Sequence, residues 1–281
     1  MPSFEDFNET QFIKGLFLGN PGSGKTGALD GLVKVGYKIY IYDFDNLLGS
    51  LFQQVKRNNP DKKNLIKYQI FTDKMKGSAI PAVMNGNQMK VLPFTDGTPT
   101  AFTRSMEQLT KWKTTSDGDL GDPGKFGRDS VVVIDSLTNL CSSAFRWCQA
   151  MNPAAKETQT YYFSAQQMVM NVITLLFSEQ FATNVLVLAH IDYRENELEI
   201  IKGFPRTIGS ALKDQIGAYF NCILMAETIG SGPSIKRMIR TNSTGIVDLK
   251  NPVSFAVPDQ LPLGDGLATF FKAVTNHVPG E

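Results

Sequence analysis

The residues best suited to chemistry form a glycine-rich loop near the start of the chain, Gly19-Asn20-Pro21-Gly22-Ser23-Gly24-Lys25-Thr26-Gly27. The loop fits the pattern G-x-x-x-x-G-K-T, in which backbone N–H groups surround phosphate oxygens. We expect Lys25 to reach the β- and γ-phosphates of a bound nucleotide, and Thr26 to hold Mg²⁺ through its hydroxyl. The whole loop is therefore predicted to bind a nucleotide.

The segments on both sides of this loop match what a phosphate-binding loop requires. Residues 12–18 form a candidate strand that leads into it, and an apolar helical face follows it at Ala28, Leu29, Leu32 and Val33. A helix that starts here would add the positive end of its dipole to the phosphate site. The alternative, a glycine-rich turn that binds nothing, would not need this strand and helix.

Two carboxylates follow the second predicted strand, residues 38–43. Asp43 ends the strand, and Asp45 stands just before a helix predicted over residues 46–57. Ligands gather at the carboxyl ends of parallel strands, so one of the two carboxylates is expected to face the γ-phosphate and orient a water molecule. Capping of the helix is the alternative for either residue, and the sequence leaves both roles open.

Two further strands also end in polar side chains. Residues 131–134 are an apolar run that ends at Asp135, and residues 185–189 are a similar run that ends at His190. Such runs are typical of buried parallel strands. We expect Asp135 to bind Mg²⁺ together with Thr26. We expect His190 to donate a hydrogen bond to the γ-phosphate, with a purely structural histidine as the alternative.

Composition narrows the class of protein. The 281 residues are 42% hydrophobic and 20% charged, with a net charge of +1, as in ordinary globular proteins. No apolar run is long enough for a membrane span, and residues 1–11 do not resemble a secretion signal. Three cysteines and two histidines without paired spacing argue against a zinc site or a disulfide framework, so a reducing cytoplasm is expected. The net charge neither supports nor excludes nucleic acid.

The remaining segments complete a single predicted domain, residues 1–281. Residues 62–127 have a looser pattern and are predicted to be a peripheral insertion, in which Asp117, Asp119 and Asp122 are a weak alternative calcium site. A loop or hairpin is expected over residues 191–206, and antiparallel strands over 219–226 and 236–241. A proline-rich tail from residue 251 is expected to wrap the surface.

Four segments together resemble the RecA-like recombinase ATPases, and most closely the short phage-type members that act as single-strand annealing ATPases. They are GNPGSGKT, YDFDNLLGSLF, VVVIDSLTNL, and VLVLAH with the later IGSALK, and the resemblance covers residues 12–252. It implies an α/β fold with a RecA-like three-layer P-loop core. That core has a mostly parallel central sheet, a peripheral insertion and C-terminal antiparallel strands. The strand before His190 would lie between the strands of the P-loop and of Asp135.

The resemblance also implies roles for individual residues. ATP and Mg²⁺ would be the cofactors, and Asp45 would take the place of the family's catalytic glutamate, although it is one methylene shorter. Phe52 stands where the family places an aromatic ring against adenine, with a core residue as the alternative. Arg240 stands where the family places basic residues that reach the ATP of a neighbouring subunit, with an exposed strand arginine as the alternative.

DNA contacts are implied in the same way. Residues 151–162 and 192–206 correspond in position to the family's two DNA-binding loops, and the candidate contacts are Lys156, Arg194, Lys202, Arg206 and Lys213. The family forms rings or filaments with ATP between subunits, which would present a repeated basic line to one strand. The phage-infected bacterial cytoplasm would be the location, and a single-strand-binding protein is a further candidate partner.

The sequence therefore favours an ATP-dependent single-stranded DNA-binding protein of phage-type recombination. Two other classes remain as alternatives. One is a RecA-like ring motor, a helicase or translocase, and the other is a nucleotide-dependent switch that binds protein. Salt-dependent affinity for single strands would separate the first two classes from the switch, and strand displacement of fixed polarity would identify the motor.

Overall fold

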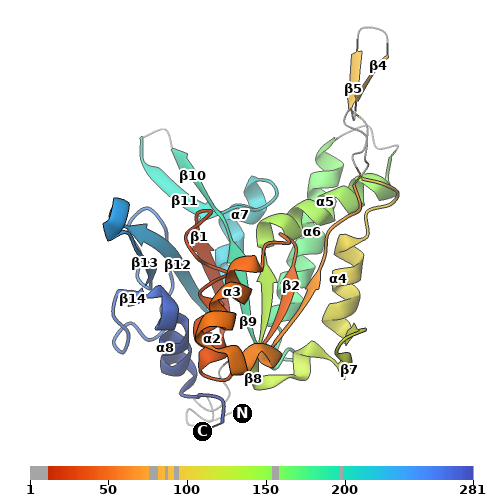
Figure 1. Cartoon of the computed structure of the whole chain (residues 1–281). Helices are drawn as coiled ribbons and strands as arrows, with labels where there is room; N and C mark the ends of the chain where they lie inside the picture. Colours follow the sequence, from red (N-terminus) through yellow and green to blue (C-terminus); the bar gives the residue numbers. More distant parts are fainter. Residues whose placement is uncertain are drawn as a thin grey trace, which may run out of the picture.

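An eight-stranded sheet forms the centre of the protein (Figure 1). The computed structural model describes residues 12–75, 82–85, 88–91, 95–153, 158–195 and 199–280. The strand order is β14-β13-β12-β1-β9-β8-β2-β3. In chain order the strands are β1 Lys14–Gly19, β2 Lys38–Asp43, β3 Ile66–Ile70, β8 Gly127–Asp135, β9 Thr183–Ala189, β12 Cys222–Ile229, β13 Lys236–Arg240 and β14 Gln260–Pro262.

The sheet is mostly parallel. Every pairing from β12 across to β3 is parallel, whereas β13 and β14 pair antiparallel at the other edge. β9 lies between β1 and β8, as expected. Because the carboxyl ends of parallel strands share one edge, the residues that follow β1, β2, β8 and β9 come together there. The predicted α/β fold class is confirmed.

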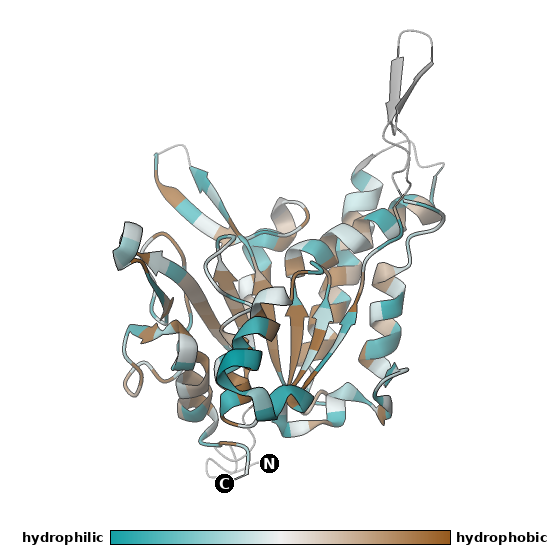
Figure 2. Ribbon diagram, viewed as in Figure 1, coloured by the Kyte–Doolittle hydropathy of each residue, from teal (hydrophilic) through white to brown (hydrophobic). Residues whose placement is uncertain are grey.

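Helices cover both faces of the sheet, so the fold has three layers, with the sheet in the middle. One face carries α2 Leu29–Lys34, α3 Gly49–Asn58 and α8 Leu263–Thr275, and the other carries α4 Ala101–Thr110, α5 Leu137–Met151, α6 Thr158–Phe177 and α7 Ser210–Ile216. Alternate side chains of β8 enter opposite layers: Val131 packs in the core with α2, and Val132 in the core with α5. Figure 2 shows hydrophobic residues concentrated in the central strands and polar residues on the outer helices.

Shorter elements decorate this core. Hairpins are formed by β4 Ala82–Asn85 with β5 Gln88–Val91, by β6 Trp112–Thr114 with β7 Gly118–Gly121, and by β10 Ile191–Glu195 with β11 Ile201–Pro205. The 3₁₀ turns are η1 Pro60–Leu65, η2 Pro123–Lys125, η3 Gly217–Tyr219 and η4 Gly232–Ser234. In Figure 1 the β4–β5 and β10–β11 hairpins project from the side where the parallel strands end.

Two predicted boundaries are corrected. Part of the expected insertion belongs to the core, because β3 extends the central sheet and the α4 side chains Phe102 and Leu109 are buried against it. The C-terminal tail does not merely wrap the surface. It contains α8, whose Phe270 and Phe271 are fully buried in the same core as α2. The tail does carry a helical pattern, because Leu267, Phe270, Phe271 and Val274 are spaced i, i+3, i+4 and i+7, and the prediction of a surface tail overlooked it.

The carboxylates of the alternative calcium site have other partners. Asp117 accepts a hydrogen bond from Lys67 at 2.7 Å, Asp119 pairs with Lys111 at 2.7 Å, and Asp122 accepts from the Gly124 N–H at 2.8 Å. Within the described residues, no cluster of three or more histidine, cysteine or acidic side chains is arranged to hold a metal. Nor does any helix of the described chain have the length and hydrophobicity needed to cross a bilayer.

Candidate functional site

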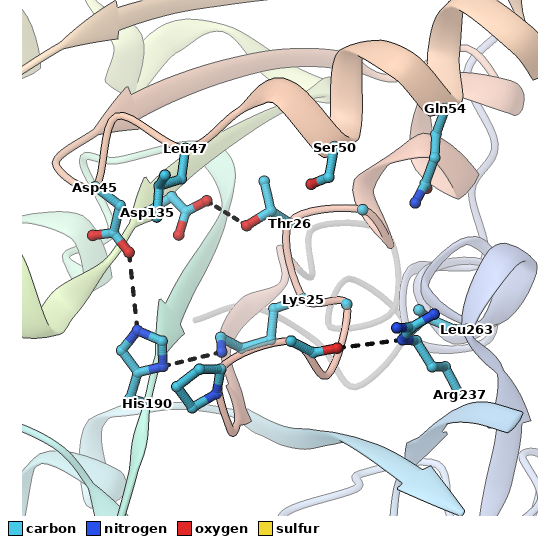
Figure 3. A pocket seen from close by; sticks show the side chains of 14 residues that line it. Lys25, Thr26, Asp45, Leu47, Ser50, Gln54, Asp135, His190, Arg237 and Leu263 are labelled. Atoms are coloured by element: carbon cyan, nitrogen blue, oxygen red, sulfur yellow. Dashed lines mark hydrogen bonds and ion pairs between the residues drawn. The ribbon is translucent and has the colours of Figure 1, made fainter. Parts of the chain in front are cut away.

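A pocket of about 560 Å³ opens where β1 ends, and the glycine-rich loop forms its floor (Figure 3). The Ala28 N–H donates to the Gly24 carbonyl at 2.9 Å, so helical turns begin directly after the loop. Gly24 has a φ of +96°, and a Cβ there would lie 2.5 Å from the Leu263 side chain. Glycine is favoured at this point by its left-handed backbone conformation, and a Cβ would in addition require the Leu263 side chain to shift.

Lys25 lies inside the loop with its side chain turned toward the pocket. Its Nζ donates to the Gly19 carbonyl at 2.8 Å and the Asn20 carbonyl at 3.3 Å, and it lies 3.3 Å from His190 Nδ1. Burial lowers the pKa of Lys25, whereas the negative charges of Asp135 and Asp45 raise it. The ammonium is placed where it can exchange these neutral acceptors for phosphate oxygens, which are stronger partners for a cation.

Thr26 and Asp135 meet across the pocket. The Thr26 hydroxyl donates to Asp135 Oδ2 at 2.7 Å, and Asp135 is only 4% exposed. Burial raises the pKa of Asp135 to about 7, and repulsion from Asp45 and Asp43 acts in the same direction. A divalent cation would offset both effects by stabilising the carboxylate form.

This donor set fits Mg²⁺. The ion favours hard oxygen ligands and uses one or two protein groups together with phosphates, which is what Thr26 and Asp135 offer. Ser23 Oγ, which lies in the same loop, is buried without a hydrogen-bond partner among the described residues and is a further candidate to bind an added oxygen group. Bound with ATP, Mg²⁺ would neutralise charge on the phosphates.

The structure separates the two carboxylates that the sequence left open. Asp43 Oδ1 accepts hydrogen bonds from the N–H groups of Asp45 at 3.0 Å and Asn46 at 2.7 Å, so it stabilises the turn after β2. Asp45 lines the pocket instead. Its Oδ1 accepts from Ser136 Oγ and from Asn139 Nδ2, each at 2.8 Å, which fixes the direction of the carboxylate. Of the two, only Asp45 is placed to orient a water molecule.

His190 lies between Lys25 and Asp45, directly after β9. Its Nε2 is 4.0 Å from Asp45 Oδ2, while Nδ1 faces the Lys25 ammonium. An ammonium can only donate, so the hydrogen-bond network assigns Nδ1 as the acceptor and places the proton of the neutral ring on Nε2. Burial and the charge of Lys25 both lower the pKa of His190 and favour this neutral form. Figure 3 shows the chain of contacts from Asp45 through His190 to Lys25.

Residues that the sequence did not single out complete the pocket. Arg237 of β13 donates from Nε to the Gly22 carbonyl at 3.3 Å, and Ser50 and Gln54 of α3 line the wall (Figure 3). The signal for Arg237 was present, because the strand prediction covered both Arg237 and Arg240. The side chains of Arg237 and Arg240 point to opposite faces of the sheet, because they are three positions apart on one strand. Arg237 is on the side that brings it to the glycine-rich loop.

Replacing Arg237 with alanine is expected to weaken ATP binding about 10-fold, because a cation that contacts the phosphate loop would be lost. A titration with a fluorescent ATP analogue would measure this. Lys236→Ala is the matched control: it removes an exposed cation from the neighbouring position, which does not line the pocket. Equal weakening by both variants would show that only net charge matters and would remove Arg237 from the site.

Two other predictions on single residues change with the structure. Phe52 does not line this pocket: its ring packs 5.0 Å from that of Tyr68 and lines a separate hollow, so its contact with adenine stays a prediction. Arg240, which was predicted to act at the ATP of a neighbouring subunit, also lies outside this pocket, and it pairs with Glu227 at 2.9 Å. A role of Arg240 in a neighbouring subunit would require this ion pair to open.

The predicted DNA contacts divide into three groups. Lys213 is 3% exposed and bonded to Asp192, so it anchors α7 to the β10–β11 hairpin and is corrected from a DNA contact to a structural residue. Lys156 lies outside the described residues. Arg194, Lys202 and Arg206 are the remaining candidates. Arg194 pairs with Asp192 at 3.4 Å and Lys202 with Asp248 at 3.5 Å, both at the protein surface.

Comparison with known proteins gives one match over most of the chain. A family model described as an AAA domain matches residues 11–253. No curated protein sequence matches the chain.

Solved structures with a similar arrangement are distant in sequence. A KaiC-like protein of the archaeon Pyrococcus horikoshii has a TM-score of 0.40 and 12% identity, over 86% of this chain and 85% of that one. The flagellar accessory protein FlaH of Methanocaldococcus jannaschii has a TM-score of 0.38 and 9% identity, over 81% and 76% of the two chains.

Proposed function

The chain belongs to the AAA domain family and is a P-loop ATPase, and from this premise we propose that it binds single-stranded DNA under the control of ATP. The proposed setting is phage-type recombination, in which the protein would anneal or pair single strands. ATP would bind over Lys25 and Thr26, and a water molecule would be oriented by Asp45. Arg194, Lys202 and Arg206 would contact the phosphates of the strand.

The observation that supports this proposal is a direct connection between His190 and the end of the β10–β11 hairpin. The Arg206 N–H donates to the His190 carbonyl at 2.7 Å, and the Arg206 carbonyl accepts from the Thr138 hydroxyl at 3.0 Å. His190 contacts Lys25 through its side chain, so one residue joins the nucleotide pocket to the segment that carries Arg206. A shift of His190 on binding ATP would therefore move Arg206 directly.

The hairpin carries cations and carboxylates together, so each candidate phosphate contact must be weighed with its acidic neighbours. The ion pairs of Arg194 and Lys202 are exposed, and exposed pairs contribute only ~0–1 kcal/mol each. Phosphates of a nucleic acid can therefore replace their carboxylate partners at little cost. The chain has a net charge of only +1, so tight binding of a strand would need several subunits side by side, as in a ring or filament.

The proposal is tested by the rate of ATP hydrolysis with and without single-stranded DNA, at about 50 mM and about 200 mM salt. We expect stimulation at the lower salt concentration that fades at the higher one, because phosphate contacts release counterions. Double-stranded DNA of equal length is the control. A rate that is indifferent to DNA under both conditions would leave the ATPase in place and favour the protein-binding switch.

The ring motor remains the second candidate, because a helicase would share the same ATPase pocket and its link through His190 to Arg206. Displacement of a labelled strand with fixed polarity would identify it. Annealing of complementary strands without such displacement would favour the recombination function.

A further inference from the structure

A second hollow, of about 590 Å³, lies beside the nucleotide pocket and shares His190 with it. Its walls are α5, the first part of α6 and residues 206–208, which follow the β10–β11 hairpin. The volume is within the range of ~300–1,000 Å³ in which proteins bind small ligands. The hollow is thus large enough for one unit of a larger ligand to enter.

One part of this hollow suits an anion. Arg146 and Arg206 line it, and no aspartate or glutamate is among the described residues that do so. Arg146 is held in place, because its Nε donates at 2.8 Å to the buried carboxylate of Asp73. Thr207 Oγ1, also in the lining, is buried and has no hydrogen-bond partner within the described chain. A buried hydroxyl without a partner is costly, and an oxygen of a ligand would satisfy it.

The other part of the hollow suits a flat ring. Phe145 and Tyr162 line it, with ring centroids 4.7 Å apart and planes at 40°. Phe145 is also in edge contact with the ring of Tyr161, whose hydroxyl donates to the Asn152 carbonyl at 2.9 Å. The Phe145 ring therefore packs against the Tyr162 ring, and 41% of Tyr162 remains exposed. A fixed, partly exposed aromatic ring is a platform on which a nucleobase can stack.

We propose that this hollow binds one nucleotide unit of the single strand, with its phosphate on Arg206 and its base stacked on Tyr162. This rests on the proposed function, since it assumes that the strand follows the β10–β11 hairpin. Only an unpaired base can turn into the hollow, so the site would select single strands over duplex. Because Arg206 is bonded to His190, the bound unit lies one residue away from the nucleotide pocket.

The test uses the wild-type chain and a thymidine oligonucleotide that carries a single 2-aminopurine, whose fluorescence is quenched when the base stacks. We expect quenching on binding with the wild-type protein. Tyr162→Ala should relieve it and weaken binding about 5- to 100-fold, whereas Tyr162→Phe should retain both quenching and affinity. Phe163→Ala is the matched control, because Phe163 is 65% exposed and does not line the hollow.

The phosphate contact is tested separately. Arg206→Gln is expected to weaken binding more than Arg57→Gln, which removes the same charge from an exposed position on α3. Equal effects would show that only net charge matters and would overturn the phosphate contact.

The outcomes also separate this inference from the proposed function. If the wild-type protein binds the strand but Tyr162→Ala and Phe163→Ala behave alike, without a change in quenching, the base site is wrong and DNA binding stands. If the wild-type protein binds no strand at all in the presence of ATP, both the base site and the proposed function fail. A cooperative thermal transition for each variant would establish that it is folded.

Discussion

Replacing Lys25 with alanine is expected to reduce ATP hydrolysis by at least ~10³-fold, and ATP-dependent binding of single-stranded DNA should be lost with it. Lys25 is the buried cation at the base of the pocket, where it now bonds to the carbonyls of Gly19 and Asn20. A positive charge at this point compensates the charge that develops on the phosphates during transfer.

Steady-state release of phosphate, measured over a range of ATP concentrations, would check this prediction. Lys34→Ala is the control: it removes a lysine from the end of α2, where the side chain forms an exposed ion pair with Asp265 at 2.9 Å. We expect that variant to hydrolyse ATP at close to the wild-type rate, because exposed pairs contribute little to stability. Retained turnover in Lys25→Ala would remove the glycine-rich loop from the catalytic site.

Replacing Asp45 with asparagine is expected to lower the turnover rate by ~10²- to 10⁴-fold and to leave ATP affinity nearly unchanged. The amide keeps the size of the side chain and an oxygen that can accept from Ser136 and Asn139. It removes the negative charge that would orient and polarise the attacking water. The loss should therefore appear in kcat and not in nucleotide binding.

Asp43→Asn provides a sharp comparison, because Asp43 lies two residues earlier and performs a different task. An asparagine oxygen can still accept from the Asp45 and Asn46 N–H groups, so the turn after β2 should persist. We expect turnover within several-fold of wild type. Single-turnover experiments on both variants would separate chemistry from binding. The reverse pattern, with Asp43→Asn inactive and Asp45→Asn active, would exchange the roles of the two carboxylates.

Several elements of the fold were predictable because they depend on short stretches of chain. The phosphate loop has its own sequence pattern, and the strands before Asp135 and His190 are uninterrupted apolar runs. In a parallel sheet the residues that follow such strands meet at one edge, and the structure brings Lys25, Asp135 and His190 together there. The arrangement of these strands in a mostly parallel sheet was predicted from the resemblance to RecA-like ATPases.

The placement of β3 and α8 was less accessible. The position of each element depends on a partner outside its own segment: β3 pairs with β2, and α8 packs against α2. Nothing in the local pattern of residues 62–127 or of the tail identifies those partners. Burial is a property of the assembled layers, and the hydrophobic gain appears only when the layers meet.

By itself, the sequence determined the phosphate loop, the strands of the parallel core and the polar residues that follow them, because these depend on local spacing. The tertiary structure alone decided which side chains face the nucleotide pocket and which pack against other parts of the chain. It directed Asp45 to the pocket and Asp43 to a turn, placed Phe52 against Tyr68, and brought Arg237 to the phosphate loop. It also buried Lys213 against Asp192, 21 positions away. The phase of a strand and the identity of a distant neighbour are set by packing between layers, which no short stretch of sequence encodes.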